Sequence, residues 1–292
     1  MITVLYEDSD VIVVEKPAGV ESQSARGFEP DMVSRIRTHI HKLSPTPSPK
    51  STNHPPYVGV IHRLDKPVRG VMVYAKNQKS AANLSAQIQE GKMRKIYAAV
   101  VCGKPVDNQG AYVDYLLKNQ GNSSSEIVDN SVDGAKRAEL TYRVLSTVKA
   151  GRWMSENPEM ELSLLDIELM TGRYHQIRVQ MAGHGTPLFG DNRYGNCLDG
   201  GKCAGAGECG FGGDRGKAPE NGAGGNRMDP GTAGSCMKYR AGGPGAVRGP
   251  RQPLALCARK LTFFHPSTGR EITCEIKPSG GAFGLFDQNL FG

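Results

Sequence analysis

Apolar and polar residues alternate at the start of the chain, as is typical of a strand. Residues 2–6 alternate in this way, a polar turn follows, and the apolar run 11–14 lasts until Pro17. This pattern predicts two short strands joined by a turn. From Pro30 onward apolar residues instead recur every four positions, which predicts a helix over 30–43.

Strand patterns dominate the rest of the chain. The expected elements are strands over 71–75, 94–101, 140–144 and 165–169, a helix over 80–90 that ends at Gly91, a helix after residue 173, and a hairpin over 261–276. Many strands with a few helices between them indicate an α+β fold, with a mixed, mainly antiparallel sheet and flanking helices.

Two segments lack these patterns. Residues 44–56 are rich in Pro and Ser and predict a linker loop, because proline fits neither a helix interior nor a central strand. Residues 196–252 are dominated by glycine and hold few large apolar side chains, so burial there would not offset the entropy lost on ordering. We therefore expect a disordered insertion at 196–252 within a single domain spanning 1–292.

Composition adds a weak indication of the partner and the compartment. Lys and Arg outnumber Asp and Glu by 36 to 29, with a pI near 9.0, which favours nucleic acid only weakly. The seven cysteines are scattered, and no secretion signal or membrane-length apolar run is present, so we expect a cytoplasmic protein with free thiols; an organelle is the alternative. The five-residue gaps between Cys197, Cys203 and Cys209 do not fit a zinc site.

The segment 62–70, HRLDKPVRG, places basic side chains around one carboxylate, Asp65. Nearby cations favour the ionised form of an aspartate. The alternative is a charged turn with a local ion pair, and the spacing alone favours this alternative over a catalytic role.

A second segment, 172–179, begins the helix predicted after residue 173. Arg173 lies near the positive helix start, where phosphate binds readily, while His175 and Arg178 lie three residues apart and share a helix face. A solvated helix face is the alternative. Tyr97, in the strand 94–101, is by itself more typical of cross-strand packing than of catalysis.

Five segments together resemble the RluA-type RNA pseudouridine synthases. HRLDKPVRGVMVYAKN resembles the motif with the catalytic aspartate, and TGRYHQIRVQMAGHGTPLFGDNRYG resembles the GRxHQIR motif with its following Gly-Asp stretch. YEDSDVIVVEKPAG, RKIYAAVVCGKP and LTFFHPSTGRE are similar to the opening hairpin, the central tyrosine strand and the last hairpin. They occur in the family's order and cover most of the chain outside the insertion, so the resemblance is specific.

The resemblance implies a catalytic role for three residues. Asp65 matches the catalytic aspartate, acting as nucleophile at C1′ or as base toward the 2′ proton. Tyr97 matches the tyrosine that stacks on the target base and is thought to help in proton removal. Arg178 matches the arginine that pairs with the aspartate and would keep it charged in a dry pocket.

Further residues are implied to contact the substrate. Arg63 would fill the space left by the flipped base, and His62, Arg173 and His175 are candidates for other RNA contacts. Arg69 stands where the family usually has serine, so we expect it to add bulk and charge near the site and to alter the target loop.

The implied fold is the pseudouridine synthase catalytic fold with a central RNA-binding cleft, here without the small N-terminal RNA-binding domain that is frequent in the family. The implied activity isomerises specific uridines in structured ribosomal or transfer RNA by base flipping, C1′–N1 cleavage, rotation and C5 reattachment. Since this reaction changes no redox state, we expect neither a metal nor an organic cofactor. The expected partner is structured RNA, with no DNA and no membrane, and the chain is expected to be a monomer.

Two other functions fit parts of the pattern. A non-catalytic RNA-binding or RNA-remodelling protein would use the same scaffold, but it would not need Asp65, Tyr97 and Arg178 together. A glycoside or nucleoside hydrolase would also use a carboxylate, but its second acid is not evident near Asp65.

Overall fold

The computed structural model describes residues 2–24, 29–43, 55–121, 123–151, 158–195 and 252–291. Most of the predicted linker and nearly all of the predicted insertion lie outside these residues. The elements are β1 (Thr3–Glu7), β2 (Val11–Lys16), α1 (Met32–Leu43), β3 (Gly59–Val60), β4 (Arg69–Ala75), α2 (Gln78–Gln89), β5 (Arg94–Cys102), β6 (Gln109–Asn119), β7 (Ser124–Val128), β8 (Lys136–Lys149), β9 (Glu161–Leu169), α3 (Gln176–Gly183), β10 (Leu256–Phe264), β11 (Glu271–Glu275), η3 (Gly281–Leu285) and η4 (Gln288–Phe291).

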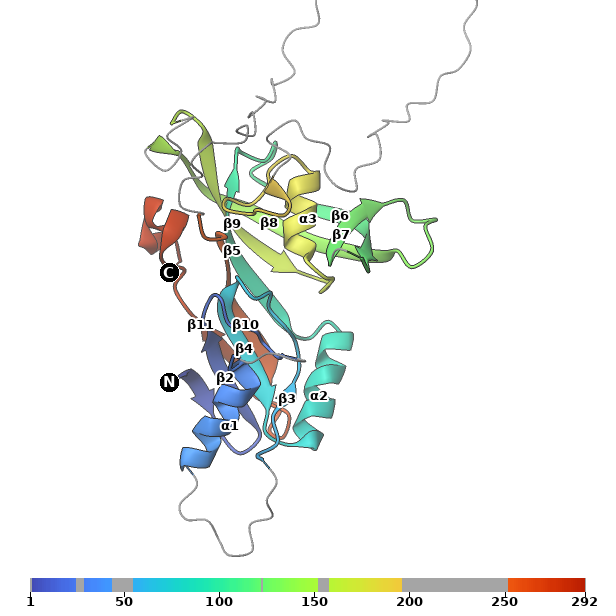
Figure 1. Cartoon of the computed structure of the whole chain (residues 1–292), viewed down its shortest axis with the longest axis vertical. Helices are drawn as coiled ribbons and strands as arrows, with labels where there is room; N and C mark the ends of the chain where they lie inside the picture. Colours follow the sequence, from blue (N-terminus) through green and yellow to red (C-terminus); the bar gives the residue numbers. More distant parts are fainter. Residues whose placement is uncertain are drawn as a thin grey trace, which may run out of the picture.

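Within the described residues the strands form one eleven-stranded sheet, in the order β1-β2-β4-β10-β5-β9-β8-β6-β7, with β3 paired to β4 and β11 to β10. The pair β4–β10 is parallel, whereas neighbours such as β2–β4, β5–β10 and β5–β9 are antiparallel. Figure 1 shows β1, β2 and β4 with α1 and α2 in the lower half, and β6 to β9 with α3 in the upper half. The predicted α+β class on a mixed, mainly antiparallel sheet is confirmed.

The close parallel contact between β4 and β10 depends on Gly70. A Cβ atom at this position would lie 2.4 Å from the Cβ of Ala258, which is too close for two non-bonded carbon atoms. The missing side chain therefore lets β10 pair with β4 on one edge and with β5 on the other, which links the two halves of the sheet.

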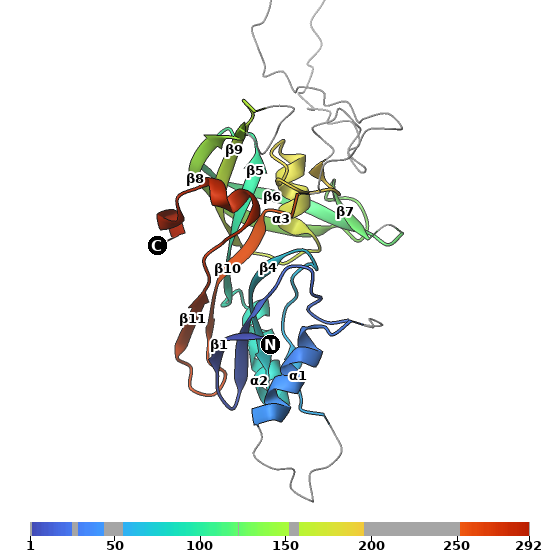
Figure 2. The ribbon, with the colours of Figure 1, turned by 60° about the vertical axis from the view of Figure 1, so that its left-hand side comes forward.

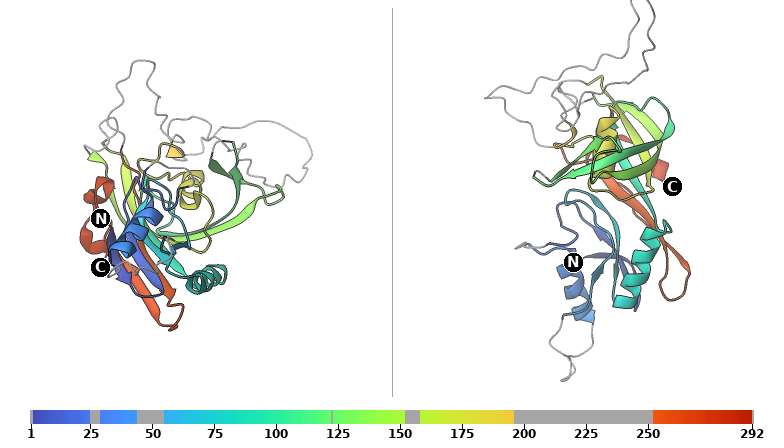
Figure 3. Two further views of the ribbon diagram at one scale, coloured as in Figure 1. Left: turned by 60° about the horizontal axis from the view of Figure 1, so that its bottom comes forward. Right: turned by 90° about the vertical axis from the view of Figure 1, so that its right-hand side faces the viewer.

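Alternate residues of β5 face opposite sides of the sheet, and the two sides are covered differently. Tyr97 belongs to the core cluster that includes Ile177 of α3. Its neighbour Ala98 belongs to the cluster that includes Phe283 of η3. Figures 2 and 3 show α3 on one side of the upper sheet and the C-terminal η3–η4 segment on the other. Strand alternation thus separates the α3 side, which carries the candidate site, from the C-terminal side.

The helices predicted over 30–43 and 80–90 occur as α1 and α2, but side-chain caps set where they begin. The amide of Ser34 donates to the Asp31 carboxylate, and the amide of Ser80 donates to the Asn77 side chain, each at 2.8 Å. These caps place the helix starts at residues 32 and 78. Among the described residues, no helix is long and apolar enough to span a membrane.

The sequence pattern does not predict β6 or β7. Exposed and half-buried residues alternate along β6, so it lacks the continuous apolar run of a buried strand. Its order comes from long antiparallel pairing with β8 and from the β6–β7 pairing at the sheet edge. Long-range pairing therefore overrides weak local propensity here.

Candidate active site

Asp65 lies in the loop between β3 and β4, and the N-terminal segment fastens this loop. The Ser22 hydroxyl donates to the Leu64 carbonyl at 2.9 Å, and the Leu64 amide donates back to the Ser22 oxygen at 3.0 Å. The Val68 amide donates to the Asp65 carbonyl at 2.9 Å and closes a turn after the aspartate. The backbone of Asp65 is therefore fixed on both sides.

Lys16, at the end of β2, is fully buried beside this loop. Its ammonium donates to the carbonyls of Pro17, Val20 and Lys66, at 3.1, 2.7 and 3.1 Å. Burial lowers the pKa of Lys16 to about 8, although the negative charge of Asp65 opposes this shift. Lys16 thus connects the opening hairpin to the aspartate loop and brings a positive charge close to Asp65.

Tyr97 is buried on the α3 side of β5. Burial, and then the nearby charge of Asp65, raise the pKa of its hydroxyl. The charge of Asp65 thus acts on the Tyr97 hydroxyl, so the two residues lie near each other, as expected for one site. No hydrogen-bond partner of the Tyr97 hydroxyl occurs among the described residues.

Arg178, in α3, lies between two carboxylates. Its Nε and Nη2 donate to Asp191 Oδ2 and Oδ1, both at 2.7 Å, while its Nη1 lies 3.5 Å from Asp65 Oδ2. The structure therefore places Arg178 beside Asp65, but the two-pronged ion pair is with Asp191. Asp191 was not among the candidate residues, although it belongs to the Gly-Asp stretch of the second motif.

Asp191 is built as a fixed anion. Its pKa is lowered: burial alone would raise it, but the hydrogen bonds and charge of Arg178 and the amides of Arg193 and Tyr194 outweigh burial. Gly190 precedes it with φ +77°, and a Cβ there would lie 2.3 Å from the Pro253 carbonyl oxygen. Only glycine fits this position, so it directs the chain into the turn that carries Asp191.

His175 is the second α3-side group that faces Asp65. It caps the helix with a left-handed backbone, φ 56°, and its Nε2 lies 3.4 Å from Asp65 Oδ2. Burial, and then the charge of Arg178 and Arg193, lower the pKa of His175 to about 3, so its ring is neutral near pH 7. A neutral ring carries one proton, and its position decides what His175 can do.

Tyr194 decides where that proton sits. Its hydroxyl accepts the Ser125 amide at 2.9 Å and lies 2.8 Å from His175 Nδ1. If the Tyr194 O–H donates to Nδ1, every group is satisfied and the His175 proton lies on Nε2, directed toward Asp65. The opposite tautomer would aim a lone pair at the carboxylate and leave the hydroxyl proton without an acceptor.

Both donors converge on one oxygen of Asp65. Nε2 of His175 and Nη1 of Arg178 approach Oδ2, and no described donor approaches Oδ1. Burial nevertheless raises the pKa of Asp65, with Arg178 opposing it and Asp191 adding to it. Arg178 thus favours the ionised form of Asp65, as expected, but burial has the larger effect on the pKa.

The remaining candidate residues lie at different places around this centre. The His62 ring accepts the Val73 amide at Nε2, 3.3 Å away, and so ties the loop to β4. Arg63 is exposed. Arg173 precedes the helix start and donates through Nε to the Arg137 carbonyl at 2.8 Å. Of these residues, His62 has a structural contact beside the site, and Arg63 is an exposed cation two residues before Asp65.

Arg69 does not act as expected. Its side chain donates to Glu15 at 2.6 Å and to the Ser279 hydroxyl at 2.7 Å. In β4 it alternates with Gly70, whose partner Ala258 belongs to the core of the site side. Arg69 therefore points to the other face of the sheet, where Glu15 neutralises its charge, and it adds no charge beside Asp65.

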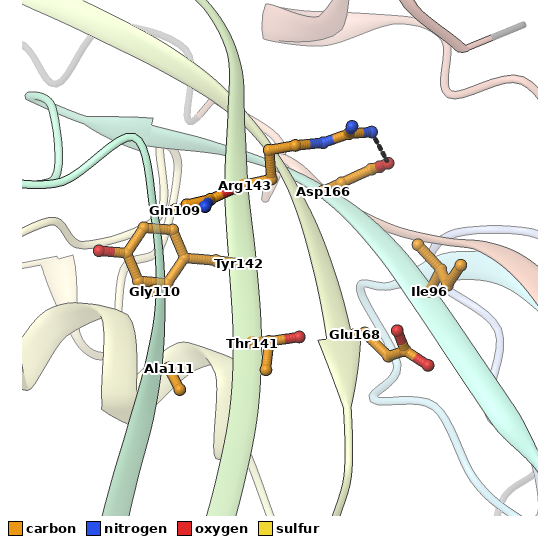
Figure 4. A pocket seen from close by; sticks show the side chains of 9 residues that line it. All are labelled: Ile96, Gln109, Gly110, Ala111, Thr141, Tyr142, Arg143, Asp166 and Glu168. Carbon is orange, nitrogen blue, oxygen red and sulfur yellow. Dashed lines mark ion pairs between the residues drawn. The ribbon is translucent and has the colours of Figure 1, made fainter.

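A surface hollow of about 550 Å³ lies on this other face and is separate from Asp65 (Figure 4). Ile96, the β5 neighbour of Tyr97, lines it together with Arg143, Asp166 and Glu168. Arg143 lies 3.8 Å from Asp166, and Arg94 pairs with Glu168 at 2.8 Å, so both acids of the hollow have a cationic partner. Across the described ranges, no group of three or more His, Cys, Asp or Glu side chains could hold a metal ion.

Three further residues lie at the site and were not predicted from the sequence: Lys16, Asp191 and Tyr194. All three lie in stretches that already resembled family motifs, VIVVEKPAG and FGDNRYG. Their position inside those stretches is the signal that would have found them.

The sequence of the chain is similar to those of known RNA pseudouridine synthases. The sequence profile described as RNA pseudouridylate synthase matches residues 10–183. An uncharacterized RNA pseudouridine synthase of Aquifex aeolicus is 35% identical over 195 residues, 66% of this chain and 56% of that protein. Ribosomal large subunit pseudouridine synthase D of Pseudomonas aeruginosa is 32% identical over 193 residues, 66% of this chain and 53% of that protein. The chain spans about half the length of these curated relatives.

Solved structures show the same fold. The human RNA pseudouridylate synthase domain containing 4 protein aligns with a TM-score of 0.59 and 18% identity, covering 97% of this chain and 90% of that one. The human domain containing 1 protein aligns with a TM-score of 0.59 and 16% identity, covering 94% and 83%.

Proposed function

Because the chain belongs to the RNA pseudouridylate synthase family, in its RluA-type branch, we propose that it isomerises uridine to pseudouridine in structured RNA. The observation that carries this proposal is the arrangement at Asp65. Oδ2 faces His175 and Arg178, while Oδ1 has no partner among the described donors. One oxygen is thus oriented, and the other is free to react with a ribose.

Base flipping brings the substrate to this oxygen. The target uridine leaves its stack, which costs a few kcal/mol, and a ring inside the pocket offsets part of this cost. Tyr97 supplies that ring on the α3 side of β5. Arg63, an exposed cation two residues before Asp65, would fill the vacated space in the RNA.

Both chemical routes use the same oxygen. In the nucleophilic route Oδ1 bonds to C1′ as the C1′–N1 bond breaks; in the base route it takes the 2′ proton. The uracil then rotates and its C5 bonds to C1′. In the nucleophilic route the Oδ1–C1′ bond breaks in this step, and in the base route the carboxyl returns its proton to C2′. The C5 proton then leaves with help from Tyr97, and N1 gains a proton. Reactant and product have the same composition, so no co-reactant is consumed. His175 and Arg178 hold the carboxylate in place throughout.

Ribosomal RNA is the substrate that we propose first, and transfer RNA second. The Pseudomonas aeruginosa relative is named for the large ribosomal subunit, which supports ribosomal RNA for this chain. The cytoplasmic location and the monomeric state stay predictions from the sequence.

Nucleoside analysis tests the proposal. The full chain is incubated with large-subunit ribosomal RNA and with transfer RNA transcripts, which are then digested and analysed by mass spectrometry. The proposal is supported if the wild-type chain forms pseudouridine and the Asp65→Asn variant does not. Released uracil would indicate a hydrolase instead, and unchanged uridine in RNA that still binds would indicate a non-catalytic RNA-binding protein.

A further inference from the structure

Lys95 lies beside the candidate active site, and its charge has no partner among the described residues. It precedes Tyr97 by two residues in β5, so the two side chains share the face that carries the site. It is half-buried. No hydrogen bond or ion pair of Lys95 occurs within the described part of the chain.

Glu168, an acid on the neighbouring strand β9, is already paired with another cation on the opposite face of the sheet. Arg94 donates through Nε to Glu168 at 2.8 Å. Burial lowers the pKa of Lys95, and no described carboxylate offsets the shift. A half-buried cation with no counter-ion destabilises a folded protein, and this cost is expected where a ligand supplies the missing charge.

Two neighbours of Lys95 bear on what its ammonium could bind, His62 and Gly172. His62 accepts the Val73 amide at Nε2, so its single proton lies on Nδ1, which has no acceptor among the described residues. Burial, and then the charge of Lys95, lower the pKa of His62 to about 3, so the ring is a neutral donor. A Cβ atom at Gly172 would lie 3.6 Å from Lys95 Nζ, and glycine leaves this approach to the ammonium open.

We propose that Lys95 and the Nδ1–H of His62 form a phosphate subsite at Gly172, which binds a backbone phosphate next to the flipped uridine. Two donors without an acceptor match the oxygens of a phosphate. The identity of the anion as RNA rests on the proposed function.

The position of the subsite fits one nucleotide. Residues two apart in a strand are separated by about 6.6 Å, which is similar to the span from a base to a phosphate of its own nucleotide. His62 lies three residues before Asp65 in the site loop, as Lys95 lies two before Tyr97 in β5. A ribose at Asp65 with its base on Tyr97 therefore directs a phosphate toward the pair formed by Lys95 and His62.

Binding of labelled RNA tests the subsite. The affinity of the full chain for a 5′-fluorescein oligouridylate of about 12 nucleotides is measured over a range of KCl concentrations. Lys95→Met should raise the Kd about tenfold and reduce the slope of log Kd against log salt by about 1. Lys95→Arg should restore both values to near wild type. Lys92→Met, at an exposed lysine three residues away, is the matched control and should change neither.

A second measurement locates the phosphate. Single phosphates of the oligouridylate are replaced by uncharged methylphosphonates, one position at a time. At one position the methylphosphonate should weaken binding to the wild-type protein. The same replacement should not weaken binding to Lys95→Met, because this variant has already lost the contact. Removing an unpaired charge should not lower the Tm, and Lys95→Gln provides a second neutral variant if Lys95→Met does not fold.

The outcomes separate the subsite from the proposed function. If Lys95→Met binds RNA with the Kd and salt slope of Lys92→Met, the subsite is refuted, even in an active enzyme. If wild type forms no pseudouridine while Lys95→Met still loses affinity and slope, the subsite stands as an RNA contact and the isomerase proposal falls.

Discussion

Arg178 is held by Asp191 and only approached by Asp65. Two of its nitrogens lie 2.7 Å from the Asp191 oxygens, whereas the third lies 3.5 Å from Asp65. The guanidinium is therefore fixed before any substrate binds, and Asp65 can react without releasing it. Such preorganisation suits a group that stabilises a changing charge.

Removing the charge of Asp191 should damage both stability and activity. Asp191→Asn leaves the buried Arg178 without its main partner, which should cost about 3–5 kcal/mol of unfolding free energy and lower the Tm by roughly 6–15 °C. Thermal unfolding and pseudouridine assays measure the two effects. Glu159→Gln is the control, since Glu159 pairs with Lys149 at an exposed site and its loss should change stability by under about 1 kcal/mol. Equal effects of the two variants would contradict the role given to Asp191.

Asp65→Asn should abolish turnover without destabilising the protein. Burial raises the pKa of Asp65, so between the ordinary and the raised value the folded chain binds more protons than the unfolded chain. In that window the unfolding free energy falls as pH rises, and the neutral amide escapes this loss. The Tm of the variant should therefore equal or exceed that of wild type near pH 7, and their difference should shrink in acid. Residual conversion by the purified variant would refute the catalytic assignment.

Tyr194→Phe should lower kcat and leave KM nearly unchanged. Without the hydroxyl, His175 Nδ1 loses its donor, and the Nε2 proton is no longer fixed toward Asp65. Loss of one hydrogen bond that orients a charged group corresponds to a decrease of about 10- to 100-fold in kcat. Tyr6→Phe is the matched control, because it removes a hydroxyl that donates to Asp8 at 2.7 Å, remote from the site. A Tyr194→Phe enzyme with wild-type kcat would show that the Tyr194–His175 contact is only structural.

Activity should fall in acid through the protonation of Asp65. The reacting carboxylate must be ionised, and burial raises its pKa, so kcat/KM should decline at a higher pH than the ordinary aspartate value near 3.8. His175, with a pKa of about 3, stays neutral over this range and should not cause the decline. Measuring kcat/KM against pH in wild type and in His175→Gln checks this. If the acidic decline of kcat/KM disappears in His175→Gln, the titrating group is His175 and not Asp65.

The sequence by itself determined most of the element types and predicted three residues that the fold brings together. Alternation and four-residue spacing are local properties, so β4, β5, α1 and α2 could be predicted within a few residues, and β8, β9 and α3 in part. Asp65, Tyr97 and Arg178 could be selected because they stand in motifs whose order along the chain is specific. The weakly patterned β6–β7 hairpin could not be predicted, since its order comes from pairing with β8.

Only the tertiary structure decided which side chains pair with each other at the site. Lys16, Tyr97 and Arg178 reach Asp65 from distant parts of the chain, and the assignment of Arg178 to Asp191 depends on how α3 and the turn after Gly190 pack. Burial has the same origin: it raises the pKa of Asp65, keeps His175 neutral and lowers the pKa of Lys95. Partners and solvent exposure are properties of packed elements, and one-dimensional spacing does not contain them.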